Sequence, residues 1–215
     1  MKAFLAILVR DLRLSLGSGG IGLPVVFFLL VATLYPFAVG PDGALLSKTG
    51  GGVLWVAALL AALLPVDRLI APDAEAGVLD QYAVRGLGEE MIAAAKITAH
   101  WIGFGPPLML AAIPASAMLR LDGETLAAVE LGLLAGTPGL AALGVMVASL
   151  TAGLRRGGAL AGLLMLPLAI PLIIFGAGSI GDFGGGAVRF LAAASLFLAA
   201  VAPFAAGAGI RALRE

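Results

Sequence analysis

The chain of 215 residues is 61% hydrophobic and 12% charged, and its 13 basic and 13 acidic side chains cancel. Soluble domains carry about 25% charged residues, so a water-soluble fold is excluded, and the balanced charge gives no indication of a nucleic-acid partner. Because the chain has no cysteine, disulfides, thiolate metal sites and cysteine nucleophiles are also excluded.

Six long stretches lack any charged residue, and each can cross a bilayer, which needs about 20 apolar residues. Strands of a β-barrel would alternate apolar and polar residues, whereas these runs are continuous. We therefore predict an all-α membrane protein, with residues 1–215 forming a single transmembrane domain. The predicted spans lie at about 21–40, 49–66, 97–119, 130–152, 158–180 and 189–210.

Residues 3–16 predict a separate helix before the first span. Lys2, Arg10 and Arg13 fall within about 80° of one another on a helical wheel, away from the apolar residues. This pattern is typical of an amphipathic helix that lies in the cytoplasmic interface. The alternative is an extension of the first transmembrane helix, although the glycines between 17 and 20 favour a break.

Residues 67–96 form the polar connection that has room for its own structure, and we expect it to be a cytoplasmic coupling loop. Within it, the sequence predicts one short helix over residues 73–83, which begins after Pro72 and carries apolar residues at helical spacing. Such a helix can dock into a groove of a partner subunit. The residues predicted to make this contact are Asp73, Glu75, Gly77, Val78, Leu79 and Tyr82.

His100, the sole histidine, and the adjacent Trp101 are candidate functional residues near the cytoplasmic end of the third span. The histidine could be a buried residue hydrogen-bonded to a neighbouring helix, a haem or metal ligand, or a group used in transport. One histidine cannot build a multi-ligand metal centre, so no metal site is predicted.

Motifs for nucleotide chemistry are absent or out of context. Residues 176–181 match the GxGxxG spacing, but this fingerprint requires a soluble βαβ unit, so we interpret it as a glycine-rich helix exit or a re-entrant turn. The chain has no Walker lysine motif, and no catalytic set lies in a span. We therefore expect a protein that is not an enzyme, with any ATP hydrolysis in a separate subunit.

The distribution of basic residues predicts the orientation. Ten of the 13 Lys and Arg residues fall on the side shared by both termini, the 67–96 loop and a second turn at Arg155 and Arg156. By the positive-inside rule this side, with both termini, is cytoplasmic.

Several motifs, in this order and spacing, resemble the haem exporter protein B (CcmB) family along nearly the whole chain. They include Asp67-Arg68-Leu69, the run from Asp73 to Gln81, Lys96 with His100-Trp101, Gly136-Thr137-Pro138, the run from Gly153 to Gly158, and Ala202-Pro203-Phe204. One departure lies at 84–88, where the family continues with a proline-rich turn and this chain reads Val-Arg-Gly-Leu-Gly.

The resemblance implies the ABC-2-type permease subunit of the cytochrome c maturation transporter in the bacterial inner membrane. The implied partners are the ATP-binding subunit CcmA, a second copy of the chain, the haem-handling subunit CcmC, the small subunit CcmD and the haem chaperone CcmE. Haem would be the transported substrate, and ATP would bind only to CcmA. Direct haem transport and ATP-driven release of the haem-loaded chaperone both remain open.

Three other functions remain as alternatives: a non-conducting scaffold of a haem-handling complex, an ABC-2 permease for another substrate, and a stand-alone secondary transporter. The secondary transporter lacks the intramembrane charges that usually form an ion path.

Overall fold

The computed structural model describes residues 1–17, 19–154, 157–180 and 184–214, and these residues form helices and connections without a β-strand. Within these described ranges, six helices are long and apolar enough to cross a membrane, which confirms the predicted all-α membrane fold. In chain order the elements are α1 (Lys2–Gly17), α2 (Gly22–Val39), α3 (Gly43–Leu63), the 3₁₀ turn η1 (Val66–Arg68), α4 (Ala71–Glu75), α5 (Val78–Val84), α6 (Glu89–Met118), α7 (Gly123–Thr151), α8 (Gly157–Gly178) and α9 (Gly184–Ala212).

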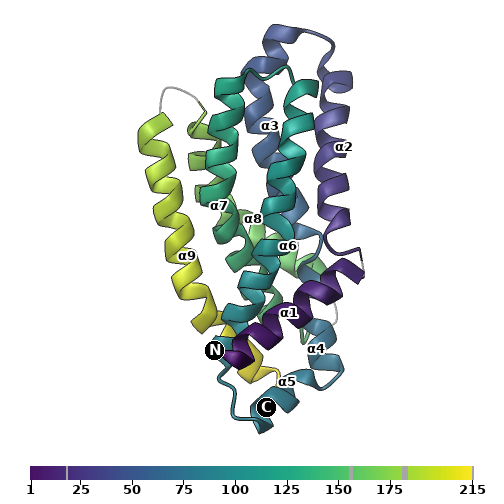
Figure 1. The fold of residues 1–215 in the computed structure, drawn as a ribbon, viewed down its shortest axis with the longest axis vertical. Helices are drawn as coiled ribbons and strands as arrows, with labels where there is room; N and C mark the ends of the chain where they lie inside the picture. Colours follow the sequence, from purple (N-terminus) through teal and green to yellow (C-terminus); the bar gives the residue numbers. More distant parts are fainter. Residues whose placement is uncertain (18, 155–156, 181–183, 215) are drawn as a thin grey trace.

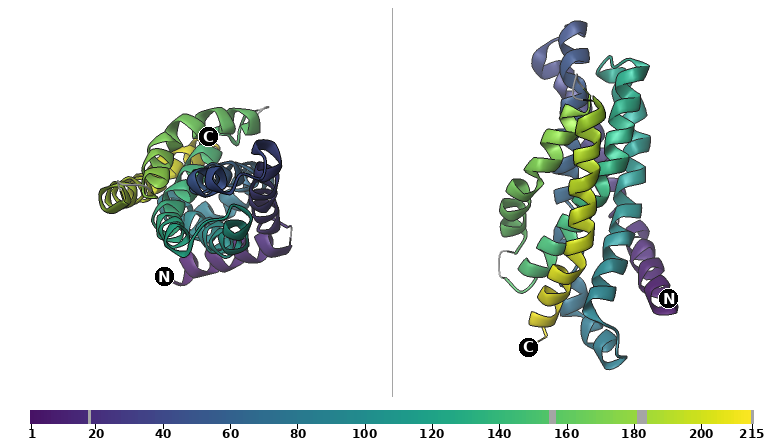
Figure 2. Two further views of the ribbon diagram at one scale, coloured as in Figure 1. Left: turned by 90° about the horizontal axis from the view of Figure 1, so that it is seen from above. Right: turned by 90° about the vertical axis from the view of Figure 1, so that its left-hand side faces the viewer.

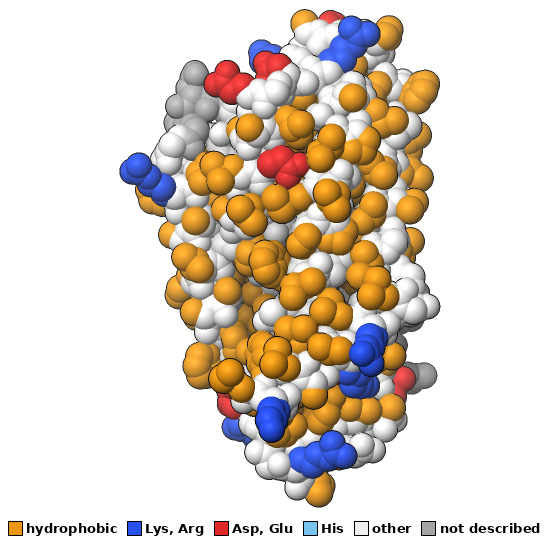
Figure 3. Space-filling view, in the orientation of Figure 1, with side chains coloured by type: hydrophobic (Ala, Val, Ile, Leu, Met, Phe, Trp, Pro, Cys, Tyr) orange, Lys and Arg blue, Asp and Glu red, His pale blue; other side chains and the backbone are white. Residues whose placement is uncertain are grey.

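The long helices run roughly along one axis, while α1 lies obliquely across the lower part of the bundle (Figure 1). The N-terminus, the C-terminus, α4 and α5 lie at the same end, which we call the terminal end (Figures 1 and 2). The connections α2–α3 and α6–α7, the end of α8 and the start of α9 lie at the opposite end. On the visible face, apolar side chains cover the middle of the bundle, and most charged side chains lie toward the two ends (Figure 3). This distribution suits a helix bundle whose flank faces lipid.

Several helices begin or end outside the charge-free stretches of the sequence because local capping decides their bounds. Asp42 accepts hydrogen bonds from the backbone N–H groups of Ala44 and Leu45, so α3 begins at Gly43 and includes Lys48. Asp122 caps α7 in the same way, through the N–H of Thr125. Side-chain oxygens at this position satisfy backbone donors that the first turn leaves free.

Helix α7 is the most buried of the six and packs against α3, α6, α8 and α9. Trp55 of α3 is fully buried against it. Glycines make room for the indole: a Cβ at Gly136 would lie 2.6 Å from the ring, and one at Gly132 would lie 3.1 Å away. Gly176 of α8 also faces the indole too closely for any side chain. These glycines therefore let three helices approach one another around one aromatic ring, as small residues do in membrane helix packing.

Candidate coupling site

The segment between α3 and α6 folds at the terminal end into η1, α4 and α5. The expectation of one helix over 73–83 is wrong, because α4 ends at Glu75 and α5 begins at Val78. Gly77 between them has a φ of 66°, a left-handed conformation that residues with a Cβ rarely adopt. The chain therefore turns at Gly77, and the two short helices present different faces.

Asp73 of α4 is buried and joins this segment to α1 and α6. Its Oδ1 accepts a hydrogen bond from Nη2 of Arg10 at 2.6 Å, and its Oδ2 accepts one from Nζ of Lys96 at 2.5 Å. Lys96, only 4% exposed, also donates to Oδ2 of Asp11 at 2.9 Å. We call Arg10, Asp11, Asp73 and Lys96 the Asp73 cluster.

The Asp73 cluster is internally neutral, with two cations against two carboxylates. Buried charges persist only when they are paired in this way, and removal of one partner leaves the others uncompensated. The hydrogen bond to Asp73 raises the pKa of Arg10, so its guanidinium stays charged. The cluster thus holds α1 against α4 and α6.

A second set of ion pairs fastens the end of α9 to α5 and to the start of α6. Arg211 lies 3.3 Å from Glu89 and 3.2 Å from Glu90. Arg214 lies 2.8 Å from Glu89 and 3.2 Å from Asp80. These mostly exposed pairs are worth up to about 1 kcal/mol each and are screened by salt. The C-terminal residues are therefore attached to the segment more weakly than α1 is.

The six residues predicted to contact a partner differ in exposure. Only Glu75 is exposed; Gly77, Val78 and Tyr82 are half-buried, and Asp73 and Leu79 are buried. Leu79 is 2% exposed and belongs to the hydrophobic core, so its side chain stabilises the fold of this chain.

Val84, at the end of α5, is an apolar residue that sequence reasoning missed. It is 90% exposed at the terminal end, beside the exposed residues Asp80 and Gln81 of the same helix. Periodicity marks apolar residues as buried, and no sequence signal distinguishes one that faces solvent. We call Asp80, Gln81 and Val84 the coupling face.

Arg155 and Arg156, the second predicted contact, lie outside the described residues. The adjacent start of α8 does contact the segment, because Asp67 of η1 lies so close to Gly158 that any Cβ there would collide with its carboxylate. Through η1, the segment therefore reaches α7 and α8 as well as α6.

His100 and Trp101 lie on α6, about one turn beyond Lys96. The His100 side chain is 8% exposed and stacks on Phe104 with ring centroids 5.6 Å apart. Its Nε2 finds no hydrogen-bond partner among the described residues, so the expected bond to a neighbouring helix is not made by this atom. Nε1 of Trp101 instead donates to Oγ1 of Thr137 at 3.1 Å and ties α6 to α7.

Glu130 is a further charged residue in a spanning helix. Because α7 begins at Gly123, Glu130 lies about two turns inside it, and its buried Oε1 has no partner within the described part of the chain. Sequence reasoning placed this residue at the edge of a span, since the capping effect of Asp122 on the helix start was not anticipated.

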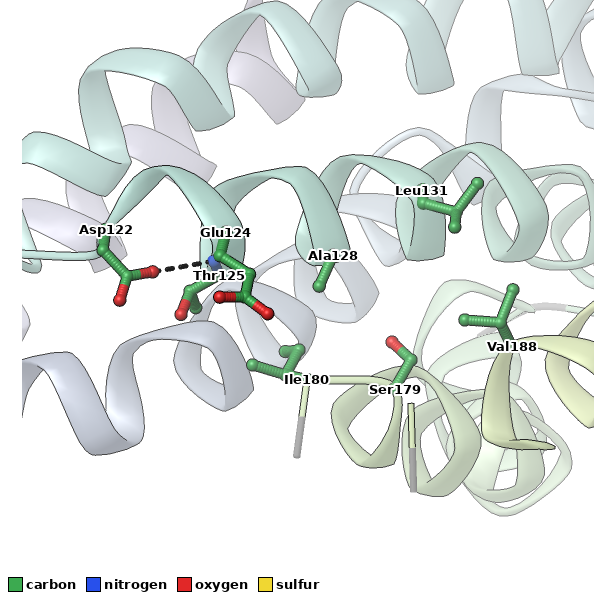
Figure 4. A pocket seen from close by; sticks show the side chains of 8 residues that line it. All are labelled: Asp122, Glu124, Thr125, Ala128, Leu131, Ser179, Ile180 and Val188. Carbon is green, nitrogen blue, oxygen red and sulfur yellow. Dashed lines mark hydrogen bonds between the residues drawn. The ribbon is translucent and has the colours of Figure 1, made fainter. Parts of the chain in front are cut away.

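At the opposite end, a cavity of about 320 Å³ lies between the start of α7, the end of α8 and the start of α9 (Figure 4). Its acidic residues are Asp122, whose Oδ1 is used as the cap of α7, and Glu124. Among the residues that the structure describes, no three His, Asp or Glu side chains converge as metal ligands.

The chain is similar in sequence to known proteins along nearly its whole length. A family model described as CcmB protein matches residues 2–213. The chain is 47% identical over 212 residues to Heme exporter protein B of Paracoccus denitrificans, covering 96% of this chain and 97% of that protein. It is 45% identical over 218 residues to Heme exporter protein B of Bradyrhizobium diazoefficiens (98% of both chains), and 37% over 199 residues to that of Escherichia coli K12 (90% of both).

Proposed function

The chain belongs to the CcmB family, and on this premise we propose that it is the membrane-spanning permease subunit of a haem exporter. The observation that carries this proposal is the full-length similarity to proteins named Heme exporter protein B, on a chain that forms six candidate spans. The scaffold, the permease for another substrate and the secondary transporter have no comparable support.

We propose further that ATP is hydrolysed by a separate ATP-binding subunit, CcmA, since the chain carries no Walker lysine motif. The coupling face is the surface we propose for this contact. It combines the exposed apolar Val84 with acidic and amide side chains, a composition that suits a helix end inserted into a partner's groove. The half-buried Val78 and Tyr82, together with Gly77, would support this face from behind.

Movement at the coupling face would reach the spans through two attachments of different strength. The Asp73 cluster connects α4 rigidly to α1 and α6, because its charges are buried and mutually paired. The ion pairs of Arg211 and Arg214 connect the end of α9 to α5 and to the start of α6 in a solvated setting, where they can break at low cost. We propose that ATP-driven displacement of α4 and α5 moves α1 and α6 together.

Orientation follows from the charge asymmetry: the terminal end would be cytoplasmic and the protein a multi-pass component of the bacterial inner membrane. Haem would be the transported cargo, in the service of c-type cytochrome biogenesis. The partners we propose are CcmA, a second copy of the chain, CcmC, CcmD and the chaperone CcmE.

A co-purification experiment tests the subunit assignment. The chain, carrying an affinity tag, is co-expressed with the proposed ATP-binding subunit CcmA, and both are extracted in mild detergent. We expect a stable complex whose ATPase activity requires both chains. ATPase activity that is unchanged when this chain is omitted, together with failure to co-purify, would contradict the proposal.

A further inference from the structure

A second cavity lies at the terminal end, where α1 crosses η1, α4 and the first turns of α6. It encloses about 280 Å³ and is lined by both apolar and charged side chains. Its apolar wall includes Leu14, Pro65, Leu69 and Ala99. Because α1 lies obliquely beside the spans at this end, the cavity falls at the level where an interfacial helix meets lipid headgroups (Figure 1).

The charges around this cavity do not cancel. Arg10, Lys96, Asp11 and Asp73 line it as the neutral Asp73 cluster. Arg68 also lines it, is exposed, and forms no ion pair within the described residues. The lining therefore carries one uncompensated positive charge beside an apolar wall.

Two uncharged polar side chains also line the cavity, Ser15 of α1 and His100 of α6. His100 is 8% exposed, but its Nε2 is fully buried and lies toward Gly144 of α7, so this nitrogen is not open to the cavity. Ser15 supplies a hydroxyl that can hydrogen-bond a ligand. His100 is therefore a reporter beside the cavity and not a ligand contact through this atom.

We propose that this cavity binds the phosphate group of an anionic glycerophospholipid from the cytoplasmic leaflet. Arg68 would supply the cation, and the hydroxyl of Ser15 would supply a hydrogen bond. The volume accommodates a headgroup and not a whole lipid, so the acyl chains would leave the cavity past Leu14 of α1, which lines it and is exposed. Basic pockets between helices at the cytoplasmic interface bind anionic headgroups by this chemistry.

The sole histidine makes a direct test practical. The protein, purified with a histidine-free tag and ¹⁵N-labelled histidine, is placed in phosphatidylcholine nanodiscs, and phosphatidylglycerol with the same acyl chains is added stepwise. We expect the imidazole resonances of His100 to shift saturably with phosphatidylglycerol. In Arg68→Gln the apparent affinity should fall by at least about tenfold, as expected for loss of a charge-assisted hydrogen bond.

Arg13→Gln is the matched control, because Arg13 is exposed on α1 and does not line the cavity. It removes the same charge from the same interface, so we expect the apparent affinity for phosphatidylglycerol to change by less than about twofold. Equal losses in both variants, or no shift with phosphatidylglycerol, would overturn the proposal. The same saturable shift produced by glycerol 1-phosphate alone, in phosphatidylcholine nanodiscs, would also overturn the proposal. The bound anion would then come from solution and not from a lipid.

Discussion

Nζ of Lys96 in α6 lies 2.5 Å from Oδ2 of Asp73 in α4, so the helix that enters the membrane holds the segment at which a partner is expected to act. Both side chains are withdrawn from solvent. A carboxylate predicted from sequence to face a partner is thus part of the internal structure of this chain.

Asp73→Asn should destabilise the protein strongly. It removes the charge that compensates Arg10 and Lys96, and breaking a buried ion pair in this way costs about 3–5 kcal/mol. Asp80→Asn is the control, because Asp80 is exposed and its pair with Arg214 is worth no more than about 1 kcal/mol. Thermal unfolding in detergent measures both, and equal stability of the two variants would contradict a buried cluster.

Val84→Asp should reduce binding of the ATP-binding subunit while leaving the stability of this chain unchanged, because Val84 is 90% exposed. Leu79→Ala should lower the stability of this chain while leaving partner binding unchanged, because truncation of a buried leucine to alanine costs about 2–5 kcal/mol of stability. The measurements are co-purification yield and thermal unfolding of the isolated chain. Full partner binding by Val84→Asp would move the interface away from the coupling face.

Gly136→Ala should destabilise the bundle by about 1–3 kcal/mol, the usual cost of overpacking a core. The added Cβ would lie 2.6 Å from the indole of Trp55. Gly162→Ala in α8 is matched in chemistry but meets nothing within 4 Å, so it should be neutral or slightly stabilising. If both variants unfold at the same temperature, the packing around Trp55 is not as described.

Single cysteines report the orientation cleanly because the chain has none of its own. We expect a membrane-impermeant maleimide to label Lys48→Cys in spheroplasts, and to label Gln81→Cys only after the membrane is disrupted. The two positions lie at opposite ends of the bundle and are both exposed. The reverse pattern would place the terminal end outside the cytoplasm.

The membrane fold follows from sequence because lipid imposes one strong constraint, continuous apolar helices, and the six charge-free stretches satisfy it. The break between α4 and α5 was missed because helical spacing continues across Gly77, and only the backbone reveals its left-handed conformation. The inward position of Asp73 was missed because its partners, Arg10 and Lys96, are 63 and 23 residues away. Val84 was missed because its exposure depends on where α5 ends.

The most direct test of the central claim is holocytochrome c formation in a strain whose own CcmB-type chain has been deleted. We predict that this chain, expressed with the proposed ATP-binding subunit CcmA, restores haem-stained c-type cytochromes, and that a subunit with an inactivated Walker lysine does not. Restoration to the same level with the inactive subunit, at matched protein amounts, would contradict an ATP-coupled permease.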